Sequence, residues 1–315
     1  MARGLMLAAL LGVLLGVPPA SAAEVLRLLS GFAPGGPVDQ IARIIAPALG
    51  AELGRTVVIE TRAGAGGTIA ANAAARAAPD GNTLLITTSS LVITAGTVPN
   101  LPYDPRRELE PLYLLGPVQT MLVARPSLGV RSMAELVALA RRGQSLSYGS
   151  TGVGSTMHIG GELFGIATGA PATHVPYRGA APAITDLVAG NIDMLNADVP
   201  VLRPFVLDRR VIPLVVYDTQ RSPQLPDVPT ATEVGLPALD MSNWYAVLAP
   251  VGVPEAMMRE LEAGLARTRA NPEVAAKLAE AGFGTPLDRT AFRAKYTADF
   301  DRWIPFLRRA GIQAE

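Results

Sequence analysis

The sequence predicts an α/β protein of two lobes, each a mostly parallel sheet flanked by helices, with two crossover strands forming a hinge. Three observations predict this fold. From residue 25 onward, short β-branched or Leu-rich runs alternate with Ala-rich segments of helical period, which is typical of parallel strands joined by crossover helices. The 315 residues suffice for one large unit or two ordinary domains. Finally, the chain ends in helices that no strand follows, and such helices have to pack against a sheet formed by strands earlier in the sequence.

The first block is predicted to have β-α-β-α-β order, because Gly and Pro mark each joint between a strand and a helix. The stretch 98–111 that follows is rich in proline and is predicted to be irregular. The predicted elements are a strand at 25–31, a helix from Pro37 to about Leu53, a strand at 56–60, a helix at 67–78 and a strand at 83–88.

The second block follows two strands, at 112–116 and 120–124, and repeats the same alternation. Its first helix begins at Ser132, with Glu135 three residues on, which is the pattern of a capping box. The remaining elements are a strand at 146–150, a helix at 155–168, a strand at 173–177, a helix at 179–190 and strands at 192–197 and 211–217.

The last part of the chain is predicted to return to the first block. A proline-rich loop with a second capping box, Thr230 and Glu233, precedes a strand at 242–250. Two crossings, near Met121–Arg125 and Ser242–Leu248, then divide the chain into one lobe of residues 23–122 with 243–315 and a second of residues 123–242. Three helices end the chain, from Pro254 to Ala270, Asn271 to Glu280 and Arg289 to Ala310.

Residues 1–22 have the pattern of an export signal. Arg3 precedes an uncharged apolar run, and Ala20, Ser21 and Ala22 form a small-residue cleavage site, so we expect cleavage between Ala22 and Ala23. The alternative, a membrane anchor, is disfavoured because the apolar run is shorter than the roughly 20 residues of a spanning helix. The sequence therefore predicts a periplasmic or secreted protein.

The composition excludes several classes of function. Lys plus Arg equals Asp plus Glu at 27 each, so no global field favours nucleic acid or an anionic membrane. There is no cysteine to form a disulfide, and with His158 and His174 as the two histidines no metal site is expected. The glycine-rich stretches lack both the P-loop and the dinucleotide fingerprint, so no cofactor is expected.

A catalytic site is not assembled by any motif. Ser150 follows Gly149 but has Tyr148 where a nucleophile elbow requires glycine. His158 falls in a helical pattern and His174 in a strand, where a structural role is favoured. A serine hydrolase using Ser150 or Ser155 with one of these histidines remains an alternative.

Four loops instead point to a small anionic ligand. All follow predicted strands, at the carboxyl edge where open α/β sheets bind ligands. Loops that are rich in small residues and lead into helix N-termini can bind a carboxylate through backbone N–H groups, without a positively charged side chain. Asp39 falls in the first turn of its helix, and Arg178 is the best local cation for a cleft. The loops are Gly35–Gly36, Gly64–Gly67, Thr87–Ser90 and Ser150–Thr156.

Several long stretches, in order, resemble the substrate-binding receptors of tripartite tricarboxylate transporters, often called Bug-type receptors. They span nearly all of the chain after the export signal. The matching stretches include "GFAPGGPVDQIAR", "LPYDP", "LSYGSTGVGSTMHIGGELF", "HVPYRGAAPAITDLVAGNID", "RSPQLPDVPTATEVGLP" and "WYAVLAP". The resemblance implies a type II-like periplasmic binding protein whose lobes close on a small carboxylate, such as a di- or tricarboxylate, an acidic amino acid or an aromatic acid.

Ligand-binding residues are carried over from the resemblance position by position. In the second lobe, Tyr177 lies near the loop. The first-lobe loop maps to Phe32, Gly35, Gly36 and Asp39, with Ser89 and Ser90 beside it, and the second-lobe loop maps to Ser150, Thr151, Gly154, Ser155 and Thr156.

The chain departs from the family pattern at two places. Where an aspartate followed by asparagine is usual, it has Ala197 and Asp198. Neighbours on a strand face opposite ways, so Asp198 is not expected to replace the lost group, although we include it among the ligand-binding candidates, and a non-amino organic acid is favoured. The stretch from Thr94 to Val98 also differs from the usual sequence.

The expected function is that of a periplasmic receptor without catalysis, which delivers a carboxylate to the membrane permease of the transporter. The resemblance also implies a monomer. A periplasmic sensor that presents its closed form to a signalling receptor is the alternative among binding proteins.

Overall fold

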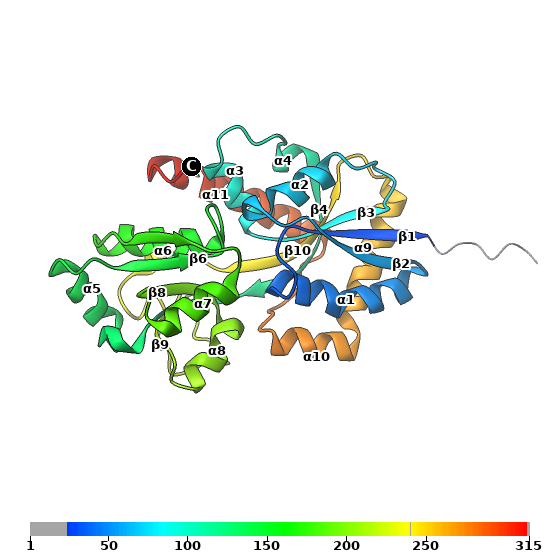
Figure 1. Ribbon diagram of the computed structural model, residues 1–315. Helices are drawn as coiled ribbons and strands as arrows, with labels where there is room; N and C mark the ends of the chain where they lie inside the picture. The colour runs from blue at the N-terminus through cyan, green and yellow to red at the C-terminus, as the bar shows by residue number, and fades with distance from the viewer. Residues whose placement is uncertain (1–23, 240, 314–315) are drawn as a thin grey trace, which may run out of the picture.

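Two five-stranded sheets, one in each lobe, organise the computed structural model (Figure 1), which describes residues 24–239 and 241–313. The export signal expected at residues 1–22 lies outside these residues. Within them, no helix combines the length and the apolar character needed to cross a membrane.

The first lobe is built by the two ends of the chain. Its sheet has the strand order β2-β1-β3-β10-β4. The N-terminal part supplies β1 (Val25–Ser30), α1 (Pro37–Leu53), β2 (Thr56–Thr61), a short 3-10 turn η1 (Ala65–Gly67), α2 (Thr68–Ala75), β3 (Thr83–Thr88), α3 (Ser90–Thr97), α4 (Pro105–Glu108) and β4 (Leu109–Val118). The C-terminal part supplies β10 (Asn243–Pro250), α9 (Glu255–Ala270), α10 (Pro272–Glu280) and α11 (Arg289–Arg309).

The second lobe is built from the middle of the chain, and its sheet has the order β7-β6-β8-β5-β9. Ser132 caps α5 by accepting the N–H of Glu135, as the first capping box predicts. The elements are β5 (Thr120–Ala124), η2 (Pro126–Leu128), α5 (Met133–Arg141), β6 (Ser147–Ser150), α6 (Thr156–Thr168), β7 (Thr173–Pro176), α7 (Ala180–Ala189), β8 (Met194–Asp198), α8 (Val199–Leu207), β9 (Ile212–Val216) and η3 (Pro237–Leu239).

The α/β class and the mostly parallel strand direction are confirmed, and one reversed strand makes each sheet mixed. In each sheet one strand runs against the other four: β10 is antiparallel to β3 and β4, and β5 is antiparallel to β8 and β9. Both reversed strands are the ones on which the chain arrives from the other lobe. The antiparallel pairing therefore follows from the crossings themselves.

Three α-helices were not predicted: α3, α8 and the short α4, which lies in the stretch 98–111 that was predicted to be irregular. The α3 sequence, "SLVITAGT", is rich in β-branched residues, which are weak helix formers. The α8 sequence has Pro200 near its start and Pro204 inside it, and an internal proline ordinarily breaks a helix. At Thr230 and Glu233 both capping-box hydrogen bonds form, yet they close a turn and no helix follows.

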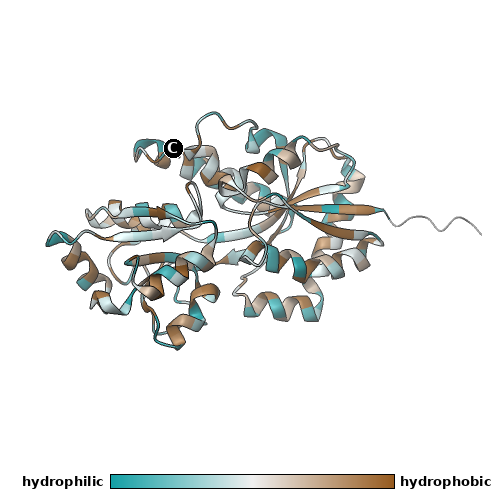
Figure 2. Cartoon of the chain, in the orientation of Figure 1, coloured by the Kyte–Doolittle hydropathy of each residue, from teal (hydrophilic) through white to brown (hydrophobic). Residues whose placement is uncertain are grey.

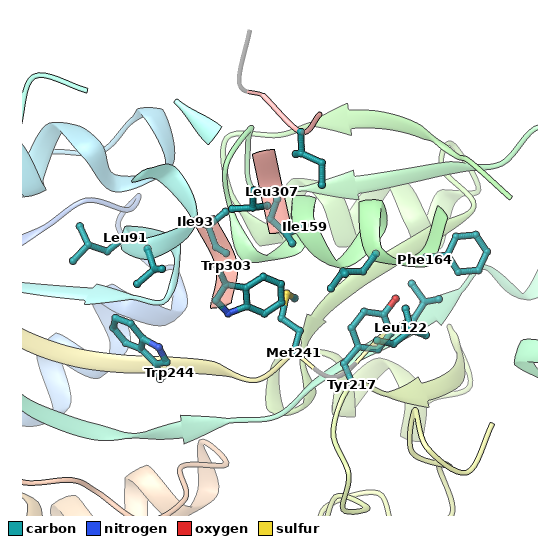
Figure 3. Close-up of a cluster of buried hydrophobic side chains, with 14 of the residues drawn as sticks. Leu91, Ile93, Leu122, Ile159, Phe164, Tyr217, Met241, Trp244, Trp303 and Leu307 are labelled. Atoms are coloured by element: carbon teal, nitrogen blue, oxygen red, sulfur yellow. The ribbon is translucent and has the colours of Figure 1, made fainter. Parts of the chain in front are cut away.

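A continuous hydrophobic cluster runs from one lobe into the other (Figure 3). It contains Trp244 on β10 and Trp303 on α11 from the first lobe, together with Ile159 and Phe164 on α6 from the second. Figure 2 shows hydrophobic colour concentrated in the strands of the first sheet, whereas the surrounding helices alternate between hydrophobic and hydrophilic turns. The lobes therefore share buried apolar surface next to the crossings.

Helix α6 lies against its sheet through two glycines. A Cβ added at Gly161 would lie 2.1 Å from the ring of Tyr148, and one at Gly160 would lie 2.5 Å from the side chain of Asn196. Both neighbours are buried. The absence of a side chain at these two positions sets how closely α6, and with it the loop that precedes it, approaches the strands.

We predict that Gly161→Ala lowers the unfolding temperature by several degrees. Overpacking a core costs about 1–3 kcal/mol, which exceeds the gain of up to about 1 kcal/mol from alanine's helix propensity. The matched control is Gly165→Ala on the same helix, where the nearest atom to an added Cβ is 3.4 Å away. Thermal unfolding followed by circular dichroism tests the pair, and equal unfolding temperatures would contradict the packing argument.

Candidate functional site

Loops from the two lobes face each other across a cavity of about 1010 Å³, here called the loop-side cavity. Each of the four loops singled out from the sequence contributes lining residues. From the first lobe the lining includes Phe32, Gly36, Gly64–Gly67, Thr88, Ser90, Asn243 and Tyr245, and from the second Thr151–Val153, Thr156, Met157, Tyr177, Arg178, Ala197 and Asp198.

A second cavity of about 1010 Å³ adjoins it, here called the helix-side cavity. Its walls are largely apolar and include Ile41, Ile184, Phe205 and Phe283. Gly36, Arg178, Asp198 and Tyr245 line both cavities, so the two are parts of one cleft between the lobes.

The first-lobe loop is shaped by Asp39. One oxygen of its buried carboxylate accepts the N–H of Gly35 at 2.9 Å and Nε of Arg43 at 2.8 Å, and the hydrogen bond from Arg43 lowers the pKa of Asp39. Gly35 has φ +78°, a backbone conformation that favours glycine. Asp39 does not line the loop-side cavity, and its contacts hold the turn that presents Gly36.

Of the two neighbouring serines, Ser89 shapes the site from behind and Ser90 lines the cavity. Ser89 donates to Oδ1 of Asn243 at 2.8 Å and points away from the cavity. Ser90 lines the cavity, and its Oγ accepts the N–H of Thr156 from the other lobe at 3.4 Å. Ser90 therefore joins the two loop systems directly.

The second-lobe loop contains three residues that fix its shape. Oγ of Ser150 accepts the N–H of Gly152, and Oγ of Ser155 caps α6 by accepting the N–H of His158. The N–H of Gly154 donates to Nδ1 of His158 at 3.2 Å. Ser150, Gly154 and Ser155 do not line the cavity, whereas Thr151 and Thr156 of the same loop do.

Backbone N–H groups without an acceptor in the protein belong to residues that line the cavity in both lobes. Among the described residues, the N–H groups of Val38, Thr151, Val153 and Met157 make no hydrogen bond, and all four residues line the loop-side cavity. Val38 lies in the first turn of α1 and Met157 in the first turn of α6, where the helix dipole also favours a negative charge. The cavity therefore offers hydrogen bonds to an anion.

The two histidines stack behind the second-lobe loop, with ring centroids 4.1 Å apart. Burial lowers the pKa of each from 6.5 to about 4, so both rings are neutral near pH 7. Nδ1 of His158 accepts a backbone N–H, which also requires the neutral form.

Nε2 of His174 lies 2.6 Å from Oγ of Ser150, so the structure does bring together a serine and a histidine. Ser150 is 0% exposed and does not line the cavity. Its hydroxyl also contacts the backbone of Gly152. This geometry fixes the loop and gives a substrate no access to the serine.

Tyr177 and Arg178 lie at the joint before α7. The Tyr177 hydroxyl donates to Asp186 at 2.7 Å, which leaves the ring against the cavity. Arg178 is exposed at the cleft and makes no ion pair within the described residues. Arg178 is therefore a solvent-exposed cation at the entrance of the cleft and not a buried one.

The alternation of neighbours on a strand, from which Asp198 is not expected to replace the lost group, does not hold at this position. Both Ala197 and Asp198 line the loop-side cavity. Asp198 is the last residue of β8 and the N-cap of α8, so the chain turns there and the alternation ends. Burial raises the pKa of Asp198 from 3.8 to about 6.

The sequence argument missed Asn243 and Tyr245, which lie on the crossing strand β10 and line the cavity. Tyr245 donates to Asp198 at 2.5 Å and Asn243 donates to it at 3.1 Å. The sequence predicts this segment as a strand and a crossing, and residues 244–250 are also part of the resemblance. No local motif indicates that its start faces a ligand.

Comparison with known proteins identifies the family. A family model described as "Tripartite tricarboxylate transporter family receptor" matches residues 41–310. The chain belongs to this family.

Two relatives show the extent of the similarity to this receptor family. A protein of Pseudomonas sp. strain P51, described as "UPF0065 protein in tcbD-tcbE intergenic region", is 38% identical over 81% of this chain and 76% of its own length. Protein BugT of Bordetella pertussis is 32% identical over 92% of this chain and 90% of its own length. The Bug-type resemblance is thereby confirmed.

Solved structures of solute-binding proteins share the two-lobe fold. The periplasmic binding protein BugD has a TM-score of 0.85 at 28% identity, covering 92% of this chain and 99% of BugD. A protein of R. palustris solved with adipate has a TM-score of 0.85 at 32% identity, with coverage of 92% and 98%. MatC of Rhodopseudomonas palustris, solved with malate, has a TM-score of 0.82 at 29% identity, with coverage of 89% and 98%.

We predict that the histidine pair makes stability fall as the pH drops from 6.5 towards 4. The folded-state pKa values lie below the unfolded value, so in this window the unfolded chain binds more protons. Asp198 acts oppositely between about pH 6 and 3.8, because its folded-state pKa is raised.

The test therefore uses Asp198→Asn as the parent and compares it with Asp198→Asn/His174→Gln. Unfolding temperatures measured from pH 7.5 to 4.5 should fall less steeply in the variant that lacks His174. Parallel curves would show that the pair does not account for the acid sensitivity.

Proposed function

We propose that this chain is a periplasmic receptor that captures a small organic carboxylate in the cleft between its lobes and delivers it to the membrane permease of a tripartite tricarboxylate-type transporter. The proposal includes export by the signal at residues 1–22 and action as a monomer. It also takes residues 23–122 with 243–315, and residues 123–242, as two lobes that hinge about the crossings.

The observation that carries the proposal is the set of unpartnered backbone N–H groups at the loop-side cavity, from Val38 in one lobe and Thr151, Val153 and Met157 in the other. A carboxylate that accepts from both sets bridges the lobes, and ligand contacts that span both lobes are what favours closure. The adipate and malate in two related structures support this class of ligand.

The candidate residues take two roles in this proposal. Residues that line the loop-side cavity contact the ligand, and residues behind them hold the loops in shape. We place Phe32, Gly36, Ser90, Thr151, Thr156, Tyr177 and Asp198 in the first group, and Gly35, Asp39, Ser89, Ser150, Gly154 and Ser155 in the second.

A screen of organic acids by thermal shift tests the proposal directly. A ligand at a hundredfold over its dissociation constant adds about 2.7 kcal/mol of stability, which raises the unfolding temperature by roughly 2–4 °C per kcal/mol. Failure of every carboxylate in a broad panel to shift the transition would remove the proposal.

We predict that Gly36→Asp abolishes carboxylate binding and leaves the fold intact. Gly36 is the N-cap of α1 with φ −76°, a position that aspartate and asparagine both favour. The added charge faces the cavity and repels an anion. Calorimetry with a carboxylate from the screen measures the effect.

The matched control is Gly36→Asn, which has nearly the same size without the charge. An added Cβ lies 3.1 Å from the carbonyl oxygen of Ala33 in both variants, so any steric cost is shared. We expect Gly36→Asp to bind at least tenfold more weakly than Gly36→Asn. Equal affinities would show that the anion lies elsewhere.

We predict that the protein does not turn over ester substrates, because Ser150 is buried behind its own loop. Any background rate should be the same in Ser150→Ala. Steady turnover that Ser150→Ala abolishes would contradict the receptor function and favour a hydrolase.

A further inference from the structure

Asp198 and Arg178 are the charged residues among those that line the loop-side cavity. The Asp198 carboxylate is half-buried at the end of β8, where the floor of the cleft meets the crossing strand β10. Arg178 is exposed and lines the cleft at the α7 joint. The fixed charge on the floor of the cavity is therefore negative.

Two donors hold this carboxylate in place. The hydroxyl of Tyr245 donates to Oδ2 at 2.5 Å, and Nδ2 of Asn243 donates to Oδ1 at 3.1 Å and to Oδ2 at 3.3 Å. Both donors lie on β10 in the first lobe, whereas Asp198 belongs to the second. The position of the carboxylate is thus fixed relative to both lobes.

The orientation of the Asn243 amide is itself determined. Its Oδ1 accepts the hydroxyl of Ser89 at 2.8 Å and the N–H of Trp244 at 2.9 Å. Since that end of the amide takes two donors, the NH₂ end faces Asp198. The hydroxyl of Tyr245 and an N–H of Asn243 donate to Asp198, so the charged group that this floor offers to the cavity is an acceptor.

The second-lobe loop contributes groups of the opposite character. The unpartnered N–H groups of Thr151, Val153 and Met157 belong to the second-lobe loop and the start of α6, and they offer donors alone. A ligand that matches both sets of groups has an anion for the N–H groups of the loop and a hydrogen-bond donor for Asp198.

We propose that Asp198, held by Tyr245 and Asn243, is a specificity-determining residue that selects carboxylates carrying an ammonium or hydroxyl group at the far end and disfavours dicarboxylates. The inference rests on the proposed function, since it assumes that the loops take the carboxylate. A second carboxylate beside Asp198 meets a like charge in a partly desolvated site, and like charges in such sites strongly oppose each other. An ammonium or hydroxyl there gains a charge-assisted hydrogen bond.

The experiment compares ligands of matched length that differ at one end. The pairs are 4-aminobutanoate with succinate, 5-aminopentanoate with glutarate and 6-aminohexanoate with adipate, together with the corresponding ω-hydroxy acids. Calorimetry on the wild-type protein at pH 7.5 is expected to give at least tenfold tighter binding of the amino or hydroxy acid in the pair that fits best. Equal or tighter binding of the diacid overturns the inference.

Asp198→Asn removes the charge and keeps the shape of the side chain. The preference for the amino acid is expected to fall at least tenfold in this variant, and an unchanged ratio overturns the inference. Arg178→Gln is the matched control at the entrance. It is expected to weaken all carboxylates without reversing the preference, and a reversal there assigns the selectivity to Arg178 instead. The wild-type comparison stands even if a variant fails to fold.

The wider screen separates this inference from the proposed function. If no carboxylate of any kind binds, the proposed function fails. If carboxylates bind but the tightest-binding ones carry no hydrogen-bond donor, the proposed function stands and the role of Asp198 is overturned. If the tightest ones carry such a donor and lose their advantage in Asp198→Asn, both stand.

Discussion

The lobes are joined where β4 continues into β5 and where the chain returns on β10, and both the shape of the cleft and the contents of the site depend on this junction. Thr120 Oγ1 donates to the carbonyl oxygen of Met241 at 3.0 Å, which ties one crossing to the other. Trp244 and Met241 continue from there into the shared hydrophobic cluster. Because the junction is packed and hydrogen-bonded, it fixes how the two lobes meet in this structure and brings the loops on either side to the same cleft.

Much of the fold follows from local patterns, and the exceptions have local causes. The helix at Pro37–Leu53 and the strands at Thr83–Thr88 and Thr120–Ala124 occur where the sequence places them, since apolar period and turn residues agree there. Helices α3 and α8 were missed because β-branched residues and an internal proline speak against them. Tertiary packing overrides such weak propensities: Val92 and Ile93 of α3 are buried, and so is Leu202 of α8.

The candidate site was only partly predictable, for a different reason. The loops themselves were found, because glycines and hydroxyls after strands are visible in the sequence. The sequence did not show which loop residues face the cavity. Ser150 and Ser155 do not, because their hydroxyls bond to the backbone of their own loop. Asn243 and Tyr245 were missed because they act through Asp198, some 45 and 47 positions away, and no local pattern records such a pairing.

The hydrogen bond from Thr156 to Ser90 has a consequence for how long a bound molecule stays. At 3.4 Å it is near the upper limit of a hydrogen bond, and even a well-formed neutral one contributes only about 1 kcal/mol. A hydrogen bond this weak adds little to those that Tyr245 and Asn243 of the first lobe donate to Asp198 of the second, and hinge motions in proteins occur within microseconds to milliseconds. Under the proposed function, the loops therefore add little to the closing of the cleft, and the contacts of the bound molecule itself determine how long it stays.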